Sequence, residues 1–333
     1  PYEIQSTIIG LSSHQLRARI AVPTQPATPT SLKLSFALFE ELQAAASSWD
    51  LDFRQLGPAS RPYQLEQVGT PNAIYNRSVF FSRFHQLGGS PAGYRTFTLL
   101  ARGSREFRWC GELITGDTLL IMPESGEFES ISPPGLDTFH LSLSIGLLTK
   151  LAQEHFDCDL SDLLGAGRQL CRHGGENLLQ LRRVLHQLSA ELPAGLGSGA
   201  AALTPLRERY LGYLLLSILR RGLDAPRGAR SRRMRALTTA LEVLQASEGR
   251  ISVPELVTAA DTSRRTLENA FQDILAVSPA TYIKAHRLQR LRGDLLLAQP
   301  GADTVNQLAR RHGFRHGGQL AADYLALYGE LPG

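Results

Sequence analysis

One short segment carries side chains whose chemistry suits the recognition of nucleic-acid bases. A helical wheel at ~100° per residue places four polar residues of this segment on one face. They are Arg265, Glu268, Asn269 and Gln272, and the face is flanked by Ser263, Arg264 and Thr266. In the major groove of DNA, arginine can donate two hydrogen bonds to guanine, and asparagine or glutamine can bridge adenine. The alternative is an ordinary solvated helix face, and the surrounding sequence must decide between the two.

The elements around this segment predict a helix-turn-helix. The sequence Ser252-Val-Pro254-Glu255 is a capping box with proline in the first helical turn. A short helix follows it and stops at Asp261-Thr262, and Ser263 can cap the next helix. The apolar residues of that second helix are spaced i, i+3, i+4, i+7 and therefore face the core. These residues are Leu267, Ala270, Phe271 and Ile274.

A second unit of the same kind is predicted about 50 residues later. Ser278-Pro279 opens a helix over residues 280–297, which would be ~27 Å long. Asp303-Thr304 then caps a short helix that ends at Gly313, and a final helix begins at about Gly318. A rod of this length could hold two recognition helices in neighbouring major grooves, which lie about one ~34 Å turn apart.

The positive charge of the chain is concentrated in its last third. The 333 residues include 35 Lys and Arg and 31 Asp and Glu, which gives a net charge of +4. Residues 1–225 hold 20 basic and 21 acidic side chains, a net of −1, and residues 226–333 hold 15 and 10, a net of +5. Because a basic region attracts polyanions, this asymmetry favours the base-contacting interpretation over a solvated face.

The remaining sequence predicts a separate N-terminal domain over residues 1–225. Residues 1–147 are mostly β, with alternating segments such as 95–99 and 106–109 that are typical of a sandwich or barrel, although residues 32–46 have helical spacing. Residues 148–225 are helical, and a linker at 226–231 leads to the C-terminal domain at 232–333. The predicted fold class is α+β, with an all-α C-terminal domain.

A leucine stripe in the predicted helical part has two interpretations. Five leucines recur at 3-4-3-4 spacing and share one helix face. They are Leu178, Leu181, Leu185, Leu188 and Leu192. The stripe either joins two copies of the chain as a dimer contact or packs on the core of its own domain.

Other functional classes find little support in the sequence. No apolar stretch reaches the ~20 residues that span a bilayer, and no signal peptide is recognisable, so we expect a cytoplasmic protein without a membrane partner. Cys110, Cys158 and Cys171 have no metal-ligand spacing, and His85 and His140 are isolated. No nucleotide-binding or catalytic motif occurs, so we predict no catalytic residue, no metal and no cofactor.

Three ordered segments resemble the AraC/XylS family of bacterial transcription regulators. They lie at Ser263–Phe271, Val277–Leu288 and Ala309–Phe314, within a resemblance that covers about 100 residues, 232–333. The ending from Gly313 to Pro332 resembles the branch typified by the ethanolamine-operon regulator.

This resemblance implies a double helix-turn-helix DNA-binding domain. It assigns base contacts in the first recognition helix to Arg265, Glu268 and Asn269. In the second recognition helix, Ala321-Ala322 stands where many members have a polar or basic pair, and Gly317-Gly318 replaces the usual polar start. The remaining candidates there suit phosphate rather than bases. They are Arg315, His316 and Gln319.

The segment Gly116 to Pro123 is similar to the cupin-like effector or dimerisation domains common in this family. We therefore expect a sequence-specific activator that binds a promoter operator in double-stranded DNA as a homodimer, with RNA polymerase as a further partner and a small-molecule effector left open. The alternative is a DNA-binding domain fused to an enzymatic module of the alkyl-transfer type. That enzyme needs a zinc-bound cysteine quartet or a Pro-Cys-His site, and the sequence has neither.

Overall fold

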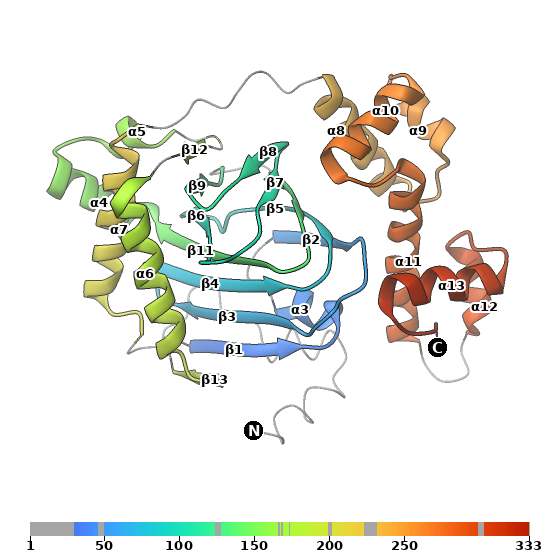
Figure 1. The fold of residues 1–333 in the computed structure, drawn as a ribbon, viewed down its shortest axis with the longest axis horizontal. Helices are drawn as coiled ribbons and strands as arrows, with labels where there is room; N and C mark the ends of the chain where they lie inside the picture. Colours follow the sequence, from blue (N-terminus) through green and yellow to red (C-terminus); the bar gives the residue numbers. More distant parts are fainter. Residues whose placement is uncertain are drawn as a thin grey trace.

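A computed structural model describes residues 30–332 apart from 46–49, 124–127, 166, 168, 173, 199–201, 223–231 and 299–302. The described residues form a β-rich N-terminal part, with helices on one side, and a helical C-terminal part (Figure 1). This arrangement confirms the α+β class and the all-α C-terminal domain. The expected linker at 226–231 lies outside the described residues, so its boundaries stay a prediction.

Two antiparallel sheets build the N-terminal part. The larger sheet has the strand order β12-β9-β6-β11-β4-β3-β1-β13, and the smaller has the order β2-β5-β10-β7-β8. The strands of the larger sheet are β1 (Thr30–Phe36), β3 (Tyr63–Gly69), β4 (Ala73–Phe80), β6 (Tyr94–Leu100), β9 (Thr118–Ile121), β11 (Leu136–Ser144), β12 (Gln169–Arg172) and β13 (Gly195–Ser198). Those of the smaller sheet are β2 (Asp50–Gln55), β5 (Phe84–Gly89), β7 (Phe107–Trp109), β8 (Glu112–Ile114) and β10 (Phe128–Ser132).

Strands lie where the alternating segments predicted them, but the helix expected over 32–46 is only partly present. Residues 30–36 form β1, and only Phe39–Ala45 is helical, as α3. The reason is non-local: β1 lies between β3 and β13, so both of its edges are hydrogen-bonded. Its neighbour β13 lies within residues 148–225, which the sequence predicted to be helical. Strand pairing overrides local helical spacing here.

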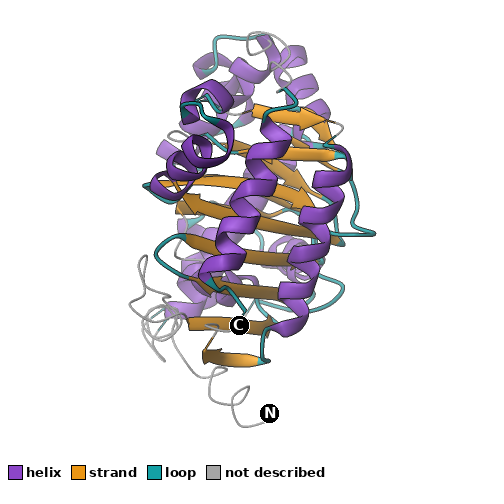
Figure 2. Cartoon of the chain, turned by 90° about the vertical axis from the view of Figure 1, so that its left-hand side faces the viewer, coloured by secondary structure: helices purple, strands orange, loops and turns teal. Residues whose placement is uncertain are grey.

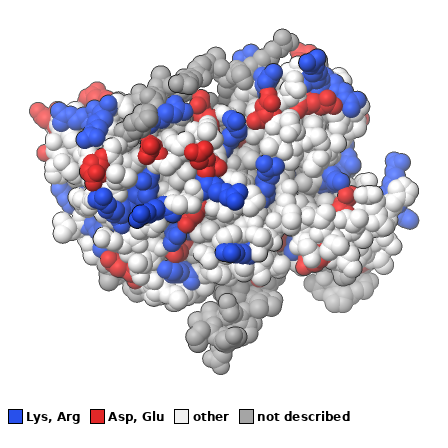
Figure 3. Space-filling model, viewed as in Figure 1, with Lys and Arg blue, Asp and Glu red and all other residues white. Residues whose placement is uncertain are grey.

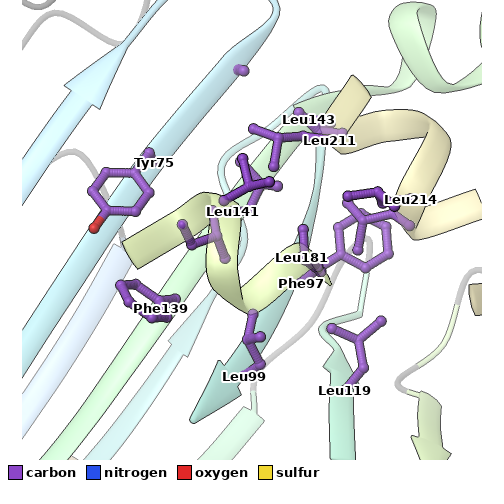
Figure 4. Close-up of a cluster of buried hydrophobic side chains, with 14 of the residues drawn as sticks. Tyr75, Phe97, Leu99, Leu119, Phe139, Leu141, Leu143, Leu181, Leu211 and Leu214 are labelled. Carbon is purple, nitrogen blue, oxygen red and sulfur yellow. The ribbon is translucent and has the colours of Figure 1, made fainter. Parts of the chain in front are cut away.

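Three helices cover the larger sheet on its outer face (Figure 2). They are α4 (Ile145–Phe156), α6 (Gly175–Glu191) and α7 (Pro205–Leu219), and a one-turn helix, α5 (Leu160–Leu163), follows α4. Their apolar faces meet the sheet in one core, where Leu181 and Leu211 lie among Phe97, Leu141 and Leu143 (Figure 4). Strands β12 and β13 return from this helical segment to the sheet, so the described residues between 30 and 222 pack as one unit.

The predicted leucine stripe of α6 belongs to this core. All five leucines are at most 4% exposed and pack against the sheet and α7 of the same chain. They are Leu178, Leu181, Leu185, Leu188 and Leu192. The dimer interpretation of these side chains is therefore wrong, because burial in their own domain leaves them no surface for a second copy. Their spacing defined the buried face of the helix correctly but could not identify what covers it.

The C-terminal part is a succession of helices in the predicted order. They are α8 (Arg232–Ala246), α9 (Val253–Ala259), α10 (Arg264–Ala270) with a wider turn at Phe271–Leu275, α11 (Pro279–Leu297), α12 (Val305–Arg311) and α13 (Gly317–Tyr328). Helix α11 is the rod between the two units, and its 19 residues make it about 28 Å long. Within the described ranges, no helix is long and apolar enough to cross a membrane.

Candidate nucleic-acid interface

The first helix-turn-helix is fixed by side-chain caps at the start of each helix. At α9, the Ser252 hydroxyl accepts from the backbone N–H of Glu255 (3.4 Å), and the Glu255 carboxylate accepts from the backbone N–H of Ser252 (2.7 Å). At α10, the Ser263 hydroxyl accepts from the backbone N–H of Thr266 at 3.1 Å. Each cap satisfies backbone donors that a helix start leaves open, which confirms both predicted starts.

The inner face of α10 and the following turn is buried as predicted. Leu267, Ala270 and Phe271 have no exposed surface, and Ile274 is 8% exposed. The Phe271 ring meets the Tyr282 ring of α11 edge-on, with centroids 5.6 Å apart. This packing sets the angle between the recognition helix and the rod.

The outer face of α10 carries the predicted base-contacting side chains. Ser263, Arg264, Arg265, Glu268 and Gln272 are exposed, and Thr266 and Asn269 are half-buried. Arg264 Nε lies 2.9 Å from Glu268 Oε1, so this pair is already satisfied within the helix. The side chains of Arg265, Asn269 and Gln272 make no hydrogen bond or ion pair with any residue that the structure describes. Their donors and acceptors are therefore available to a ligand.

The second helix-turn-helix has the same capped helix start as the first but different side chains on its exposed surface. Thr304 and Gln307 form a capping box at the start of α12, and Gly313 takes the left-handed conformation (φ 81°) before Phe314. At α13, His316 occupies the cap position without a side-chain cap bond. The predicted candidates Arg315, His316 and Gln319 are all exposed at this helix start.

A groove of about 450 Å³ lies between the rod and the start of α13. Its polar lining comprises Ser252, Lys284, Arg287, Arg315, His316, Gln319 and Asp323 and so has more basic than acidic side chains, and Lys284 Nζ lies 2.8 Å from Asp323 Oδ1. The structure thus brings Arg315, His316 and Gln319 together, and no residue of α10 lines this groove. In the view of Figure 3, basic side chains lie along the outer edge of the C-terminal part with some acidic ones among them, and both signs are interspersed over the N-terminal part.

Two groove residues, Lys284 and Arg287, were not singled out from the sequence. Their i, i+3 spacing on a predicted helix was the available signal, since it places both on one face. Arg287 also has a structural role: its guanidinium donates to the carbonyls of Gly249 (2.6 Å) and Ile251 (3.0 Å). It thereby ties the turn before α9 to the rod.

The opposite face of the rod is buried against the N-terminal part. Its residues are spaced i, i+4, i+7, i+10: Tyr282, His286 and Arg292 are buried, and Gln289 is half-buried. The groove residues Lys284 and Arg287 point away from this face. The rod therefore separates the candidate nucleic-acid surface from the surface that contacts the β-sheets.

Comparison with known proteins supports this account of the C-terminal part. Residues 256–333 match a family model described as a helix-turn-helix domain. The chain is 30% identical over 150 residues to the probable thc operon regulatory protein of Rhodococcus erythropolis, covering 44% of each chain. It is 32% identical over 82 residues to the XylDLEGF operon transcriptional activator of Pseudomonas putida, covering 25% of this chain and 26% of that one. The matches span less than half the length of these relatives.

Solved structures give looser similarities. The AraC-like transcriptional activator CuxR aligns with a TM-score of 0.42 and 14% identity over 79% of this chain and 98% of its own. An apo form of ToxT from Vibrio cholerae aligns with a TM-score of 0.34 and 11% identity over 78% and 95%.

The capped helix pairs, the rod and the matched region define a helix-turn-helix domain. In this domain the sequence motifs resemble those of the AraC/XylS family, and relatives of the chain are named as an operon regulatory protein and an operon transcriptional activator. The narrower resemblance to the ethanolamine-operon branch stays a prediction. No group of three or more His, Cys, Asp or Glu residues in the described part could hold a metal ion.

His286 makes the rod sensitive to acid. Its ring is 2% exposed, and neither ring nitrogen has a hydrogen-bond partner within the described residues. Burial, reinforced by the charges of Arg54 and Arg290, lowers the pKa of His286 to about 3. In the unfolded chain, His286 binds a proton below its ordinary pKa of about 6.5. In the folded chain it stays neutral down to about pH 3, so the free energy of unfolding falls as the pH falls from 6.5 towards 3.

We expect acidification from pH 7 to pH 5 to cost the wild type about 2 kcal/mol more than a His286→Leu variant, as measured by denaturant unfolding at both pH values. The control is His155→Gln, because His155 is exposed on α4. Equal pH dependence of the wild type and His286→Leu would contradict a neutral buried His286.

Proposed function

We propose that the chain is a sequence-specific DNA-binding transcription regulator, an activator that acts as a dimer on a promoter operator. The observation that carries this proposal is the unsatisfied polar row Arg265, Asn269 and Gln272 on a helix whose opposite face is fully packed. The relatives named as an operon regulatory protein and an operon transcriptional activator support it. Its site of action is the cytoplasm, where bacterial DNA lies, and its protein partner as an activator is RNA polymerase.

The two recognition helices have different tasks in this proposal. Helix α10 and the turn after it enter a major groove and contact base edges with Arg265, Asn269 and Gln272, flanked by the phosphate-facing Ser263, Arg264 and Thr266. Glu268 is held by Arg264 in the free protein and must exchange that partner to accept from a cytosine. At α13, Arg315, His316 and Gln319 border a basic groove and have short alanines behind them, which suits the DNA backbone.

A small-molecule effector is not part of the proposal. The enclosed cavity between the two sheets, lined by residues such as Trp109, Met122 and His140, has a volume of about 20 Å³. That is room for one water molecule. None of the three cysteines forms a disulfide, and nothing in the site favours the fused-enzyme alternative.

We propose a second copy of the chain as the partner of α7. Leu206, Tyr210 and Tyr213 form an exposed apolar stripe on this helix, at 79%, 41% and 41% exposure. The stripe is bordered by both charge signs, with Arg209 Nη2 paired to Glu154 of α4 at 2.6 Å. A two-fold dimer uses the same patch on both copies, so a patch with both signs can complement itself.

Base contact by α10 is tested with Arg265→Ala and Asn269→Ala. We expect each variant to lose about 1–3 kcal/mol of binding to the preferred DNA and to relax discrimination at one base pair. The measurement is the Kd for every single-base variant of a sequence that the wild type selects from a random pool. Gln187→Ala, at an exposed position on α6, serves as the control. Uniform weakening across all base variants would contradict base contact.

Phosphate contact by α13 is tested with Arg315→Ala. Each phosphate neutralised by a cation contributes about 0.9 to the slope of log K against log salt. We therefore expect this variant to reduce the slope by about 0.9 and to weaken every sequence alike. An unchanged slope, or a specific loss at one base pair, would show that Arg315 does not act on phosphate.

The dimer surface is tested with Leu206→Glu. A charge in the stripe, at its most exposed apolar side chain, is expected to shift the protein to monomers, because it would be buried without a partner. Sedimentation equilibrium measures the shift, with Leu297→Glu as the control, since Leu297 is also exposed (61%) but lies at the end of the rod. If Leu206→Glu leaves the mass unchanged, the stripe is not the dimer contact.

A further inference from the structure

Hydrogen bonds to the Tyr282 hydroxyl attach the N-terminal part to the start of the rod, and these contacts form the first grip. Arg54 Nη1 of β2 donates to this oxygen (3.3 Å), and His85 Nδ1 of β5 lies 2.6 Å from it. Because Arg54 can only donate, the tyrosine proton is available to His85 Nδ1. His85 then carries its own proton on Nε2, 3.1 Å from Glu129 Oε1 of β10. All four residues are less than 10% exposed, so this chain of hydrogen bonds is shielded from water.

A second grip lies near the end of the rod. Arg292 Nε is 2.7 Å from Glu40 Oε1 of α3, and Arg292 Nη1 donates to the Tyr324 hydroxyl of α13 at 3.0 Å. The guanidinium also lies over the Tyr328 ring, 4.4 Å from its centroid, and pairs with Glu330. Arg292 therefore joins an N-terminal helix to the helix that carries the second recognition surface.

Two amide side chains add contacts between the grips. Gln289 Nε2 of the rod donates to the carbonyl of Phe53 at 2.6 Å. Gln55 Nε2 of β2 donates to the carbonyl of Leu327 in α13 at 3.0 Å. Each contact joins a side chain of one part to the backbone of the other, so the rod is held in one register along β2.

The two grips reach different helix-turn-helix units. Tyr282 packs on Phe271, directly after α10, and Arg292 bonds to Tyr324 of α13. Ten residues separate them, about 15 Å along the rod. The N-terminal part therefore contacts both units at once, and it does so on the rod face opposite the groove residue Lys284.

We propose that Glu40, Arg54 and His85 are positioning residues for DNA binding: the N-terminal part braces the rod and fixes the relative orientation of the two recognition surfaces. This inference rests on the proposed function. The brace leaves the DNA surfaces uncovered, because Arg265 and Arg315 stay exposed while the rod is docked. Fixing both surfaces before binding reduces the ordering that DNA binding must otherwise impose.

The test uses full-length protein with Tyr282→Phe and Glu40→Gln. Tyr282→Phe keeps the ring that packs on Phe271 and removes only the oxygen shared by Arg54 and His85. Its control is Tyr94→Phe, because the Tyr94 hydroxyl donates to Pro71 inside the N-terminal part and is remote from the rod. Should Tyr282→Phe fail to fold, Arg54→Gln removes the same grip from the other side.

The first readout is binding to three DNAs derived from the sequence that the wild type selects. One carries both half-sites at the selected spacing, one has two base pairs inserted between them, and one keeps only the half-site of α10. We expect both variants to bind the selected spacing about fivefold more weakly, as for the loss of one hydrogen bond, and to bind the single half-site unchanged. Wild-type discrimination between spacings in both variants would overturn the brace.

The second readout is amide hydrogen exchange along α11 without DNA. We expect faster exchange in both variants than in the wild type and Tyr94→Phe, because the rod is released more often from the sheet. Unchanged exchange would also overturn the brace. A wild type that selects no DNA sequence would contradict the proposed function instead, and hydrogen exchange would still decide whether the brace exists.

Discussion

The burial of one face of α11 is the interaction on which the arrangement of the C-terminal part depends. Tyr282 is fully buried and contacts both Phe271 of the first unit and the strands of the smaller sheet. Arg292 contacts Glu40 of α3 in the N-terminal part and Tyr324 of α13 in the second unit. A helix with 3.6 residues per turn can present such a stripe and still offer Lys284 and Arg287 on its other side. The rod is thus a spacer, a core element and a domain contact at once.

Charge is distributed in keeping with this division. The exposed arginines of the recognition surfaces face solvent, whereas Arg54 and Arg292 are buried and partnered by groups of the opposite part. Burying an ion pair contributes little net stability, because the desolvation of both ions offsets their attraction. A buried ion pair nevertheless requires one geometry. If the rod shifted, the buried guanidinium of Arg292 would lose the Glu40 carboxylate as its partner. Such contacts therefore select one arrangement of the rod on the N-terminal part and add little to the strength of the contact.

Local signals predicted the C-terminal domain almost completely. Ser252, Ser263 and Thr304 cap their helices because capping involves residues only three apart, and the apolar spacing of α10 identified its buried face correctly. The predictions failed where partners are distant in sequence. Strand β1 depends on pairing with β13, more than 150 residues away, and the leucines of α6 are covered by a sheet that their spacing cannot specify. Arg54 and His85 were missed as contacts of the rod for the same reason, because single polar residues in strands carry no periodic signal.

In the proposed function, α10 contacts bases while α13 and the groove beside it hold the DNA backbone one helical turn away. Selection of random double-stranded DNA by the full-length protein, followed by sequencing, is the most direct test. We expect one sharply defined half-site and, about 10 base pairs from it, a second region with weak base preference but a fixed distance. Two half-sites defined equally well would contradict the division between the helices. Recovery of unrelated sequences would contradict sequence-specific binding itself.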